Sequence, residues 1–431
     1  MGKKAKARRE GKGYLRGCLL TLATAFVILA VIVAFMASFG GFGTGPSANA
    51  DEFAQHAVPV SDIEVPAGAR VVALGEATHG NREFQELKLD VFQTLVERHG
   101  VRAFALEADF GGCAQVNRYV HGGEGTVDEA VANLVFTLYR TDQMAELISW
   151  MRTYNETAAP GEDLCFYGFD MQSYEYSYRA LLDELHRLDL DASDLESLWD
   201  GDDFVDGVDV DRVSAILTET HQRLEGLVDE RDVTLALQLV DCLLQNIELG
   251  KVIDSPDGYG ARDAFMAQNV LWILEREEAR GNSCIFVSAH NGHIDQAGSY
   301  GPGSKVMGHL LADELGEAYY AIGTDFFRAE VNLPSEDGRM THTFYSYDPL
   351  AKAAATCGYE TCWLDFSAVP SDSPLARYID GPISMGSVGE GFSPFMYVLP
   401  QTYRVKREPS SPYDSMVFVP YATPTQITVA S

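Results

Sequence analysis

Basic residues are scarce in this chain. It has 32 Lys and Arg against 63 Asp and Glu, which gives a formal net charge of −31 over 431 residues. Several of the basic residues are concentrated in residues 1–16, so the remainder is more acidic still. An acidic body repels the phosphates of nucleic acids, and we therefore exclude a DNA- or RNA-binding function.

Two common nucleophile patterns are also absent. The sequence has no G-x-S-x-G motif, which would expose a catalytic serine, and no cysteine follows a predicted strand in a charged setting. The 7 cysteines form no C-x-x-C pair and no repeated Cys/His spacing, which argues against a zinc module. Cys357 and Cys362 lie close together on either side of Gly358, and they are the first candidates for a disulfide in an exported domain.

One apolar run near the N-terminus is unusually long. Residues 18–39 carry no charge and follow a basic segment. A helix needs about 20 apolar residues to cross a bilayer, and positive charges favour the cytoplasmic side. The pattern predicts a basic cytoplasmic head over 1–16, a transmembrane helix or signal anchor over 17–39 and a linker over 40–52.

This interpretation places the protein in the cell membrane as a single-pass protein with its catalytic domain outside the cytoplasm. The small residues of Ala48-Asn49-Ala50 are typical of a signal cleavage site, which is the alternative to an uncleaved anchor. Both interpretations export residues 51–431.

From residue 70 onward, short apolar runs alternate with helical periodicity. Runs such as Val71–Leu74 are typical of strands that are buried on both faces of a parallel sheet. The alternation predicts an α/β fold, with a mostly parallel sheet covered by helices. We assign the predicted parts as follows: an α/β catalytic core over 53–173 and 281–330, a helical subdomain over 174–280, and a small mixed α+β region with the tail over 331–431.

Ionisable residues stand where the predicted strands end. In parallel α/β sheets these ends share one edge, and ligand sites form there. His79 and His293 follow two of the ends at short distance, although the chain has only 10 histidines. The strand ends themselves carry Glu76, Glu107, Asp170, His290 and Asp325. Their combination predicts a catalytic site more strongly than any one of them does.

His79 is the expected general base of this site. It lies just before a predicted helix, whose positive end disfavours the imidazolium and keeps the ring able to accept a proton. We expect Glu76 or Glu107 to orient the ring. Because no serine or cysteine nucleophile is indicated, we expect His79 to activate a water. His290 or His293 would then stabilise the oxyanion or protonate the leaving group.

At these same residues the sequence resembles the erythromycin esterase family. The motifs run in the family's order over about residues 70–330, and they include VVALGEATHGNREFQELK at 71–88, FALE at 104–107, FYGFDMQS at 166–173, RDAFMAQNVLWIL at 262–274 and SAHNGHI at 288–294. The resemblance implies an α/β core with a helical domain and a small mixed domain. It also implies ester or lactone hydrolysis, with the active-site positions at Glu76, His79, Glu107, His290 and His293.

Three further residues are candidates for holding the substrate. Arg82 and Arg262 lie within the matched motifs, and Asp170 lies at a strand end. We expect these side chains to line the site with the five positions above. The long apolar segment near the N-terminus is not part of the family's core pattern.

Three functional hypotheses remain open. The first is an extracytoplasmic hydrolase of the erythromycin esterase type, which cleaves a small-molecule ester or lactone without a cofactor. The second is a metal-dependent hydrolase, in which the same Glu and His side chains bind zinc or manganese. The third is a non-catalytic envelope protein that binds a glycan or lipid, and the intact set of five residues argues against it. The membrane is a further expected partner, through the N-terminal helix.

Overall fold

The computed structural model describes residues 21–34, 46–200, 204–205, 208–335 and 338–428. A seven-stranded sheet runs through the centre in the order β10-β13-β7-β1-β4-β2-β3. Its neighbouring strands are parallel, except for the antiparallel pair β10–β13. The strands are β1 (Val71–Glu76), β2 (Ala103–Asp109), β3 (Cys165–Asp170), β4 (Ile285–His290), β7 (Tyr319–Asp325), β10 (Cys362–Asp365) and β13 (Ser415–Phe418). The predicted α/β fold with a mostly parallel sheet is therefore confirmed.

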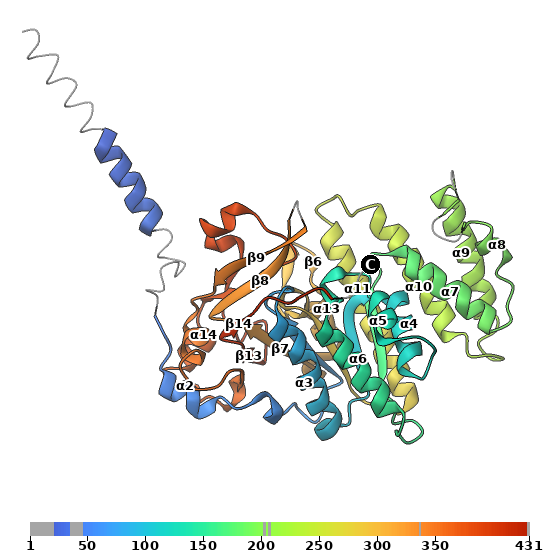
Figure 1. The fold of residues 1–431 in the computed structure, drawn as a ribbon, viewed down its shortest axis with the longest axis horizontal. Coiled ribbons are helices and arrows are strands. Elements are labelled where there is room, and N and C mark those ends of the chain that lie inside the picture. The colour runs from blue at the N-terminus through green and yellow to red at the C-terminus, as the bar shows by residue number, and fades with distance from the viewer. Residues whose placement is uncertain (1–20, 35–45, 201–203, 206–207, 336–337, 429–431) are drawn as a thin grey trace, which may run out of the picture.

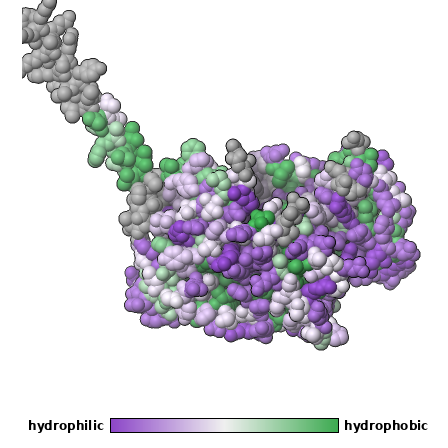
Figure 2. All heavy atoms as spheres, viewed as in Figure 1, coloured by the Kyte–Doolittle hydropathy of each residue, from purple (hydrophilic) through white to green (hydrophobic). Residues whose placement is uncertain are grey.

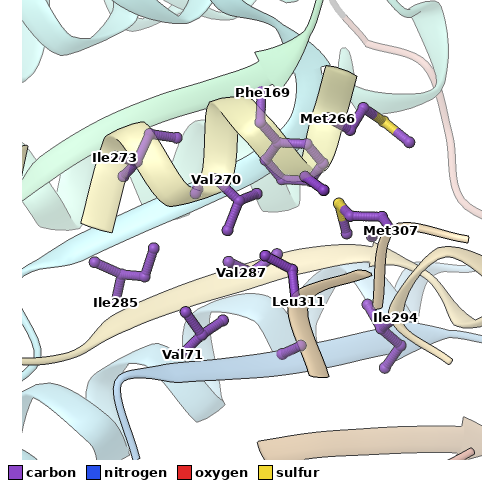
Figure 3. Packing of buried hydrophobic residues seen from close by; sticks show 14 of the residues in the cluster. Val71, Phe169, Met266, Val270, Ile273, Ile285, Val287, Ile294, Met307 and Leu311 are labelled. Carbon is purple, nitrogen blue, oxygen red and sulfur yellow. The ribbon is translucent and has the colours of Figure 1, made fainter. Parts of the chain in front are cut away.

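Alternation of side chains along the strands builds two cores, one on each face of the sheet. Val71 and Val287 point to one face, where they pack against Val270 and Leu311 from the covering helices, as Figure 3 shows. The helices on this face are α11 (Gly258–Arg280) and α13 (Met307–Leu315).

The opposite face is covered by helices from the first half of the chain. Val72 and Phe286 point there, and they belong to the same buried cluster as Val91 and Ile148. The helices concerned are α3 (Arg82–His99), α4 (Phe110–Val120), α5 (Val127–Ala132) and α6 (Asp142–Asn155). Both faces are thus closed to water, and the strand ends remain as the place for a site.

Two further parts extend the α/β core. Helices follow β3 before the chain returns to the sheet, and Figure 1 shows them gathered on one side of the molecule. They are α7 (Tyr174–Arg187), α8 (Ser193–Glu196), α9 (Val210–Glu225) and α10 (Thr234–Gly250), followed by α11. On the other side, a small sheet in the order β14-β8-β9 follows β7. Its strands are β8 (Arg328–Ser335), β9 (Gly338–Tyr345) and β14 (Tyr421–Ala422).

Short elements complete the fold. They are α2 (Ala50–His56), α12 (Asn291–Ile294), α14 (Pro349–Ala354), α15 (Ala376–Ile379), the pair β5 (Ser299–Gly301) and β6 (Ser304–Lys305), and the pair β11 (Ile383–Gly386) and β12 (Arg404–Arg407). Strands β10 and β13 come from the range 331–431, yet they lie in the main sheet. The division of the chain into separate units stays a prediction.

The predicted membrane span over 17–39 is wrong for the part of the chain that is described. Residues 21–34 are helical and exposed. No helix among the described residues has the length and apolar character to cross a membrane. The predicted single-pass location in the cell membrane depended on this span and is therefore also wrong. The basic head over 1–16 and the flanks 17–20 and 35–39 of the span lie outside the described residues.

The expected disulfide is also missing. Cys357 and Cys362 are both free thiols in the structure. Sγ of Cys357 donates a hydrogen bond to the carbonyl oxygen of Ala354 at 3.0 Å. The two thiols also interact with each other, and the hydrogen bond with Cys362 lowers the pKa of Cys357 to about 6.

Gly75 allows a close approach at the end of β1. A Cβ atom at this position would overlap Oδ1 of Asn291. That side chain ties the loop after β4 to β7, because its Nδ2 donates to the carbonyl oxygen of Thr324 at 2.7 Å and its Oδ1 accepts from the amide of Thr324 at 3.1 Å. A residue larger than glycine at position 75 would therefore displace the segment that carries His290.

We predict that Gly75→Ala lowers the free energy of unfolding by about 1–3 kcal/mol, the usual cost of overpacking a tight core. Urea denaturation followed by circular dichroism measures the change. Gly250→Ala is the matched control, because a Cβ atom at the end of α10 meets nothing within 4 Å. Equal stability of the Gly75→Ala variant and the unmodified chain would contradict this packing argument.

Candidate active site

The sheet brings the predicted residues together at its carboxyl edge. β4 lies between β1 and β2, and Glu76 pairs in register with His290. β2 then supplies Glu107, and β3, the next strand, ends at Asp170. Neighbouring parallel strands that end at one edge thus place these side chains side by side, as the sequence predicted.

Glu76 is the centre of the first group of contacts, and it is only 1% exposed. Its Oε1 lies 2.6 Å from Nδ1 of His79, and its Oε2 accepts a hydrogen bond from Nζ of Lys88 at 2.6 Å. Tyr139 OH donates a weaker hydrogen bond to Oε1 at 3.4 Å. Burial alone would raise the pKa of Glu76, but Lys88 and His79 outweigh it and lower the pKa to about 2. Glu76 is therefore a carboxylate at any physiological pH.

His79 is held in one orientation by this carboxylate. Burial lowers the pKa of its ring, but the charges of Glu76 and Glu107 act in the opposite direction and leave the pKa above its ordinary value of 6.5. The sequence analysis expected the positive end of α3 to keep the ring neutral. A carboxylate in direct hydrogen-bonding contact is a stronger influence than a helix end, which is worth about 0.3–1 kcal/mol near a surface.

A second group of contacts is centred on Arg262 of α11. Its Nη2 donates to Oε1 of Glu107 at 2.7 Å and to Oδ2 of Asp170 at 2.6 Å. Oε2 of Glu107 accepts the backbone amide of His290 at 2.8 Å. Burial raises the pKa of Glu107, but His293 and Arg262 lower it well below its ordinary value. Arg262 thus joins the ends of β2 and β3, and through Glu107 it also fixes the end of β4.

His293 is a buried cation in this second group. Its Nε2 lies 3.3 Å from Oε1 of Glu107, and its Nδ1 lies 2.8 Å from Oδ1 of Asp263. Burial lowers the pKa of the ring, but these two carboxylates raise it to about 10. The imidazolium is therefore charged throughout the neutral range, which suits it to holding Glu107 and not to moving protons.

His290 differs from both other histidines. Burial and the neighbouring rings of His79 and His293 lower its pKa to about 3, so the ring is neutral. Its Nδ1 accepts a hydrogen bond from the amide of Gly292 at 3.2 Å, and the proton therefore resides on Nε2. Among the described residues that Nε2 has no hydrogen-bond partner, although it is buried. The centres of the His79 and His290 rings are 4.9 Å apart.

Arg82 does not join this arrangement. Its side chain is 51% exposed and pairs with Glu83 at 3.5 Å and Glu86 at 3.4 Å along the outside of α3. Arg262 and Asp170 do lie in the site, where they bind each other. Whether the three hold substrate stays a prediction.

Sequence reasoning missed Lys88 and Asp263. Of the two, Lys88 could have been found from the sequence. Lys88 lies in the apolar stripe of α3 between Phe84 and Val91, where a charged side chain has no water and needs a buried partner. Asp263 directly follows Arg262 in a matched motif, but its sequence position does not reveal that it faces His293.

We predict that Lys88→Met lowers the free energy of unfolding by about 3–5 kcal/mol, because it leaves the Glu76 carboxylate buried without its cation. Chemical denaturation at neutral pH measures the loss. The double variant Glu76→Gln/Lys88→Met should regain part of it, since both charges are then removed together. A Lys88→Met protein as stable as the unmodified chain would show that the pair does not stabilise the fold.

Comparison with known proteins agrees with this geometry. The family model described as erythromycin esterase matches residues 96–422. Erythromycin esterase type II of Escherichia coli is 25% identical over 350 residues, which cover 70% of this chain and 82% of that protein. A putative hydrolase of Bacillus subtilis (strain 168), YbfO, is 23% identical over 324 residues, which cover 65% of this chain and 70% of that protein.

Solved structures share the fold. A succinoglycan biosynthesis protein superposes with a TM-score of 0.71 at 20% identity, covering 88% of this chain and 98% of that chain. A mutant of the erythromycin esterase EreC in its open conformation gives a TM-score of 0.57 at 18% identity, covering 86% and 94%. The match to the family model begins after Glu76, His79 and Lys88, but it takes in Glu107, Asp170, Arg262, His290 and His293 and most of the chain. The protein therefore belongs to the erythromycin esterase family and is a hydrolase of the esterase type.

Proposed function

We propose that the protein hydrolyses an ester or lactone by general base catalysis, with His79 activating the attacking water. The observation that carries this proposal is the contact of Nδ1 of His79 with the Glu76 carboxylate at 2.6 Å. Because Glu76 stays ionised, the neutral ring keeps its proton on Nδ1 and presents the lone pair on Nε2. A water at Nε2 then loses its proton to the ring as it attacks the carbonyl carbon.

Glu76 stabilises the imidazolium that this proton transfer creates. It remains a carboxylate throughout the step, because Lys88 and His79 lower its pKa to about 2. The proton on His79 is then available to the departing alkoxide oxygen, which leaves as an alcohol. Ester and water thus become acid and alcohol, and the ring returns to its neutral form.

His290 supplies the hydrogen bond that the developing oxyanion needs. Its neutral ring carries the proton on Nε2, where no protein group accepts it in the described part of the chain. A donor that is fixed in advance and lacks a partner is what stabilises charge that appears only in the transition state. Glu107 fixes its position through the amide of His290.

Glu107, Arg262 and His293 act as positioning residues in this proposal. Arg262 and His293 both contact Oε1 of Glu107, at 2.7 and 3.3 Å, and they leave its Oε2 for the His290 amide. Proton transfer is therefore assigned to His79, and stabilisation of the oxyanion to His290.

A metal-dependent mechanism would need carboxylates that are free to bind a cation. Glu76 already faces Lys88, and Glu107 faces both Arg262 and His293. A zinc or manganese ion would have to displace these buried cations, so the donor set does not fit a metal. The first hypothesis is the better supported for this reason.

We predict that His79→Asn lowers kcat about 10²–10⁴-fold, the usual contribution of a general base, while the fold is retained. Erythromycin is the first lactone to test, because the Escherichia coli relative is named for it, and p-nitrophenyl acetate is a simple ester for comparison. His186→Asn is the matched control, since that side chain is 56% exposed on α7. Undiminished turnover by a folded His79→Asn protein would disprove the proposal.

The pH dependence should follow His79. As a base its ring must be neutral, so kcat/KM should rise with pH through the pKa of His79, which lies above its ordinary value. In Glu76→Gln the pKa of His79 should fall, because the carboxylate that raises it is gone, and the rising limb should move to lower pH. Profiles of kcat/KM from pH 5 to 9 measure the shift. Glu86→Gln is the control and should leave the rising limb in place. If the limb does not move in Glu76→Gln, the group that titrates is not His79.

A further inference from the structure

An exposed apolar surface lies on the β8–β9 hairpin and the segment that packs against it. We call it the aromatic shelf and define it as Met340, Phe395, Tyr397 and Val398. These side chains are 54, 68, 52 and 51% exposed. Single exposed apolar residues are common, but a group of large ones in one place marks a binding surface. Figure 2 shows that hydrophilic side chains dominate the visible face of the molecule, so such groups are the exception.

A packed layer holds the aromatic shelf in place. Met340 and His342 point to the same face of β9, because side chains alternate along a strand. The ring of Phe392 stacks on His342 with 3.6 Å between centres, and it lies 5.4 Å from the ring of Tyr397. The short helix Pro394–Tyr397 carries two of the exposed side chains. The shelf therefore rests on neighbouring rings and is not a free loop.

One ring nitrogen of His342 is unused within this layer. The side chain is 8% exposed, and burial lowers the pKa of its ring, so the ring is neutral. Its Nδ1 lies 2.8 Å from Tyr397 OH, and either group can donate this hydrogen bond. Its Nε2 is buried without a partner in the described part of the chain. A buried polar atom of this kind is costly unless a ligand or water satisfies it.

The shelf adjoins the loop that carries His79. The amide of Val388, on the same segment as Phe395, donates to the carbonyl oxygen of Ala77 at 2.7 Å. The amide of Asn332 on β8 donates to the carbonyl oxygen of Gly80 at 3.0 Å. Glu390 contributes to the raised pKa of His79, which places its charge near the ring. The segments that carry the shelf are thus hydrogen-bonded to the loop that carries His79.

A second pair of exposed rings flanks the centre on the side of β3. Tyr259 at the start of α11 and Tyr300 on β5 are 65 and 43% exposed, and their ring centres are 5.6 Å apart. Tyr300 OH donates to Oδ2 of Asp263 at 3.5 Å, next to His293. Apolar rings on both sides of a charged centre fit a substrate whose ester group lies within a larger apolar body.

We propose that the aromatic shelf binds the apolar part of the ester substrate, with a hydrogen bond between Nε2 of His342 and a polar group of the substrate. This inference rests on the proposed hydrolysis at His79. It names the substrate class as esters or lactones with an extended hydrocarbon portion, in contrast to short, polar esters. Shelf contacts are made to a part of the substrate that does not react, so they govern affinity.

The test uses two esters that differ in the length of the acyl chain, p-nitrophenyl acetate and p-nitrophenyl octanoate. Binding is measured by titration calorimetry on the full chain carrying His79→Asn, which keeps the esters intact. Adding Phe395→Ser and Val398→Ser should weaken octanoate binding about tenfold, which corresponds to about 1.4 kcal/mol, and should change acetate binding less than about twofold. Val228→Ser, on a side chain that is 55% exposed elsewhere, is the matched control and should change neither.

The same substitutions in the active chain separate this proposal from the one it rests on. KM for the octanoate should rise by about the same factor as its Kd, with kcat within about twofold. Equal octanoate affinity with and without the shelf substitutions would overturn the shelf proposal, and so would octanoate binding no tighter than acetate binding in the parent chain. Turnover that survives in His79→Asn would instead refute the hydrolytic mechanism. His342→Phe keeps the stacked ring but removes Nε2. If this variant binds both esters with unchanged affinity, the hydrogen bond at His342 is not part of substrate binding.

Discussion

The active site depends on one buried ion pair, between Glu76 and Lys88. Both side chains are about as buried as the apolar core around them, with exposed fractions of 1%. A carboxylate in such surroundings would take up a proton unless a cation stabilised it, because removing a charge from water costs several kcal/mol. Lys88 supplies the cation from the middle of α3, at 2.6 Å. His79 therefore has an ionised partner, and the ion pair ties the end of β1 to the middle of α3.

The parallel sheet turns this local pair into a site. Glu107 and His290 come from positions far apart in the sequence, yet their strands are neighbours of β1 or of each other. Arg262 reaches the same edge from α11, which covers one face of the sheet and packs on the same core that Figure 3 shows. The site is rigid because each charged group is bound by two elements at once. Rigidity of this kind lets the donors and acceptors be in place before a substrate arrives.

The sequence predicted the strand ends well and the partners across the site poorly. Apolar runs ending in Glu76, Glu107 and His290 were visible because a strand buried on both faces leaves an unmistakable pattern. Lys88 and Asp263 were missed because contacts between a helix and a strand end depend on how the helix is rotated, which periodicity gives only coarsely. The membrane span was predicted from hydropathy, which reports only the composition along a run. Spanning a membrane also requires a continuous helix of sufficient length, and no helix among the described residues combines that length with apolar character.

The electrostatics of the site also support the proposal that His79, among three histidines, is the base. His293, between two carboxylates, has a pKa of about 10, and His290, beside two other rings, has a pKa of about 3. Neither ring changes its charge near neutrality. Glu76, with a pKa of about 2, does not change either. His79 contacts one carboxylate directly. Burial lowers the pKa of its ring, but Glu76 raises it above 6.5. His293, in contrast, contacts two carboxylates. In the proposed mechanism, His293 therefore provides a charge and His290 a hydrogen-bond donor, and proton transfer is assigned to His79.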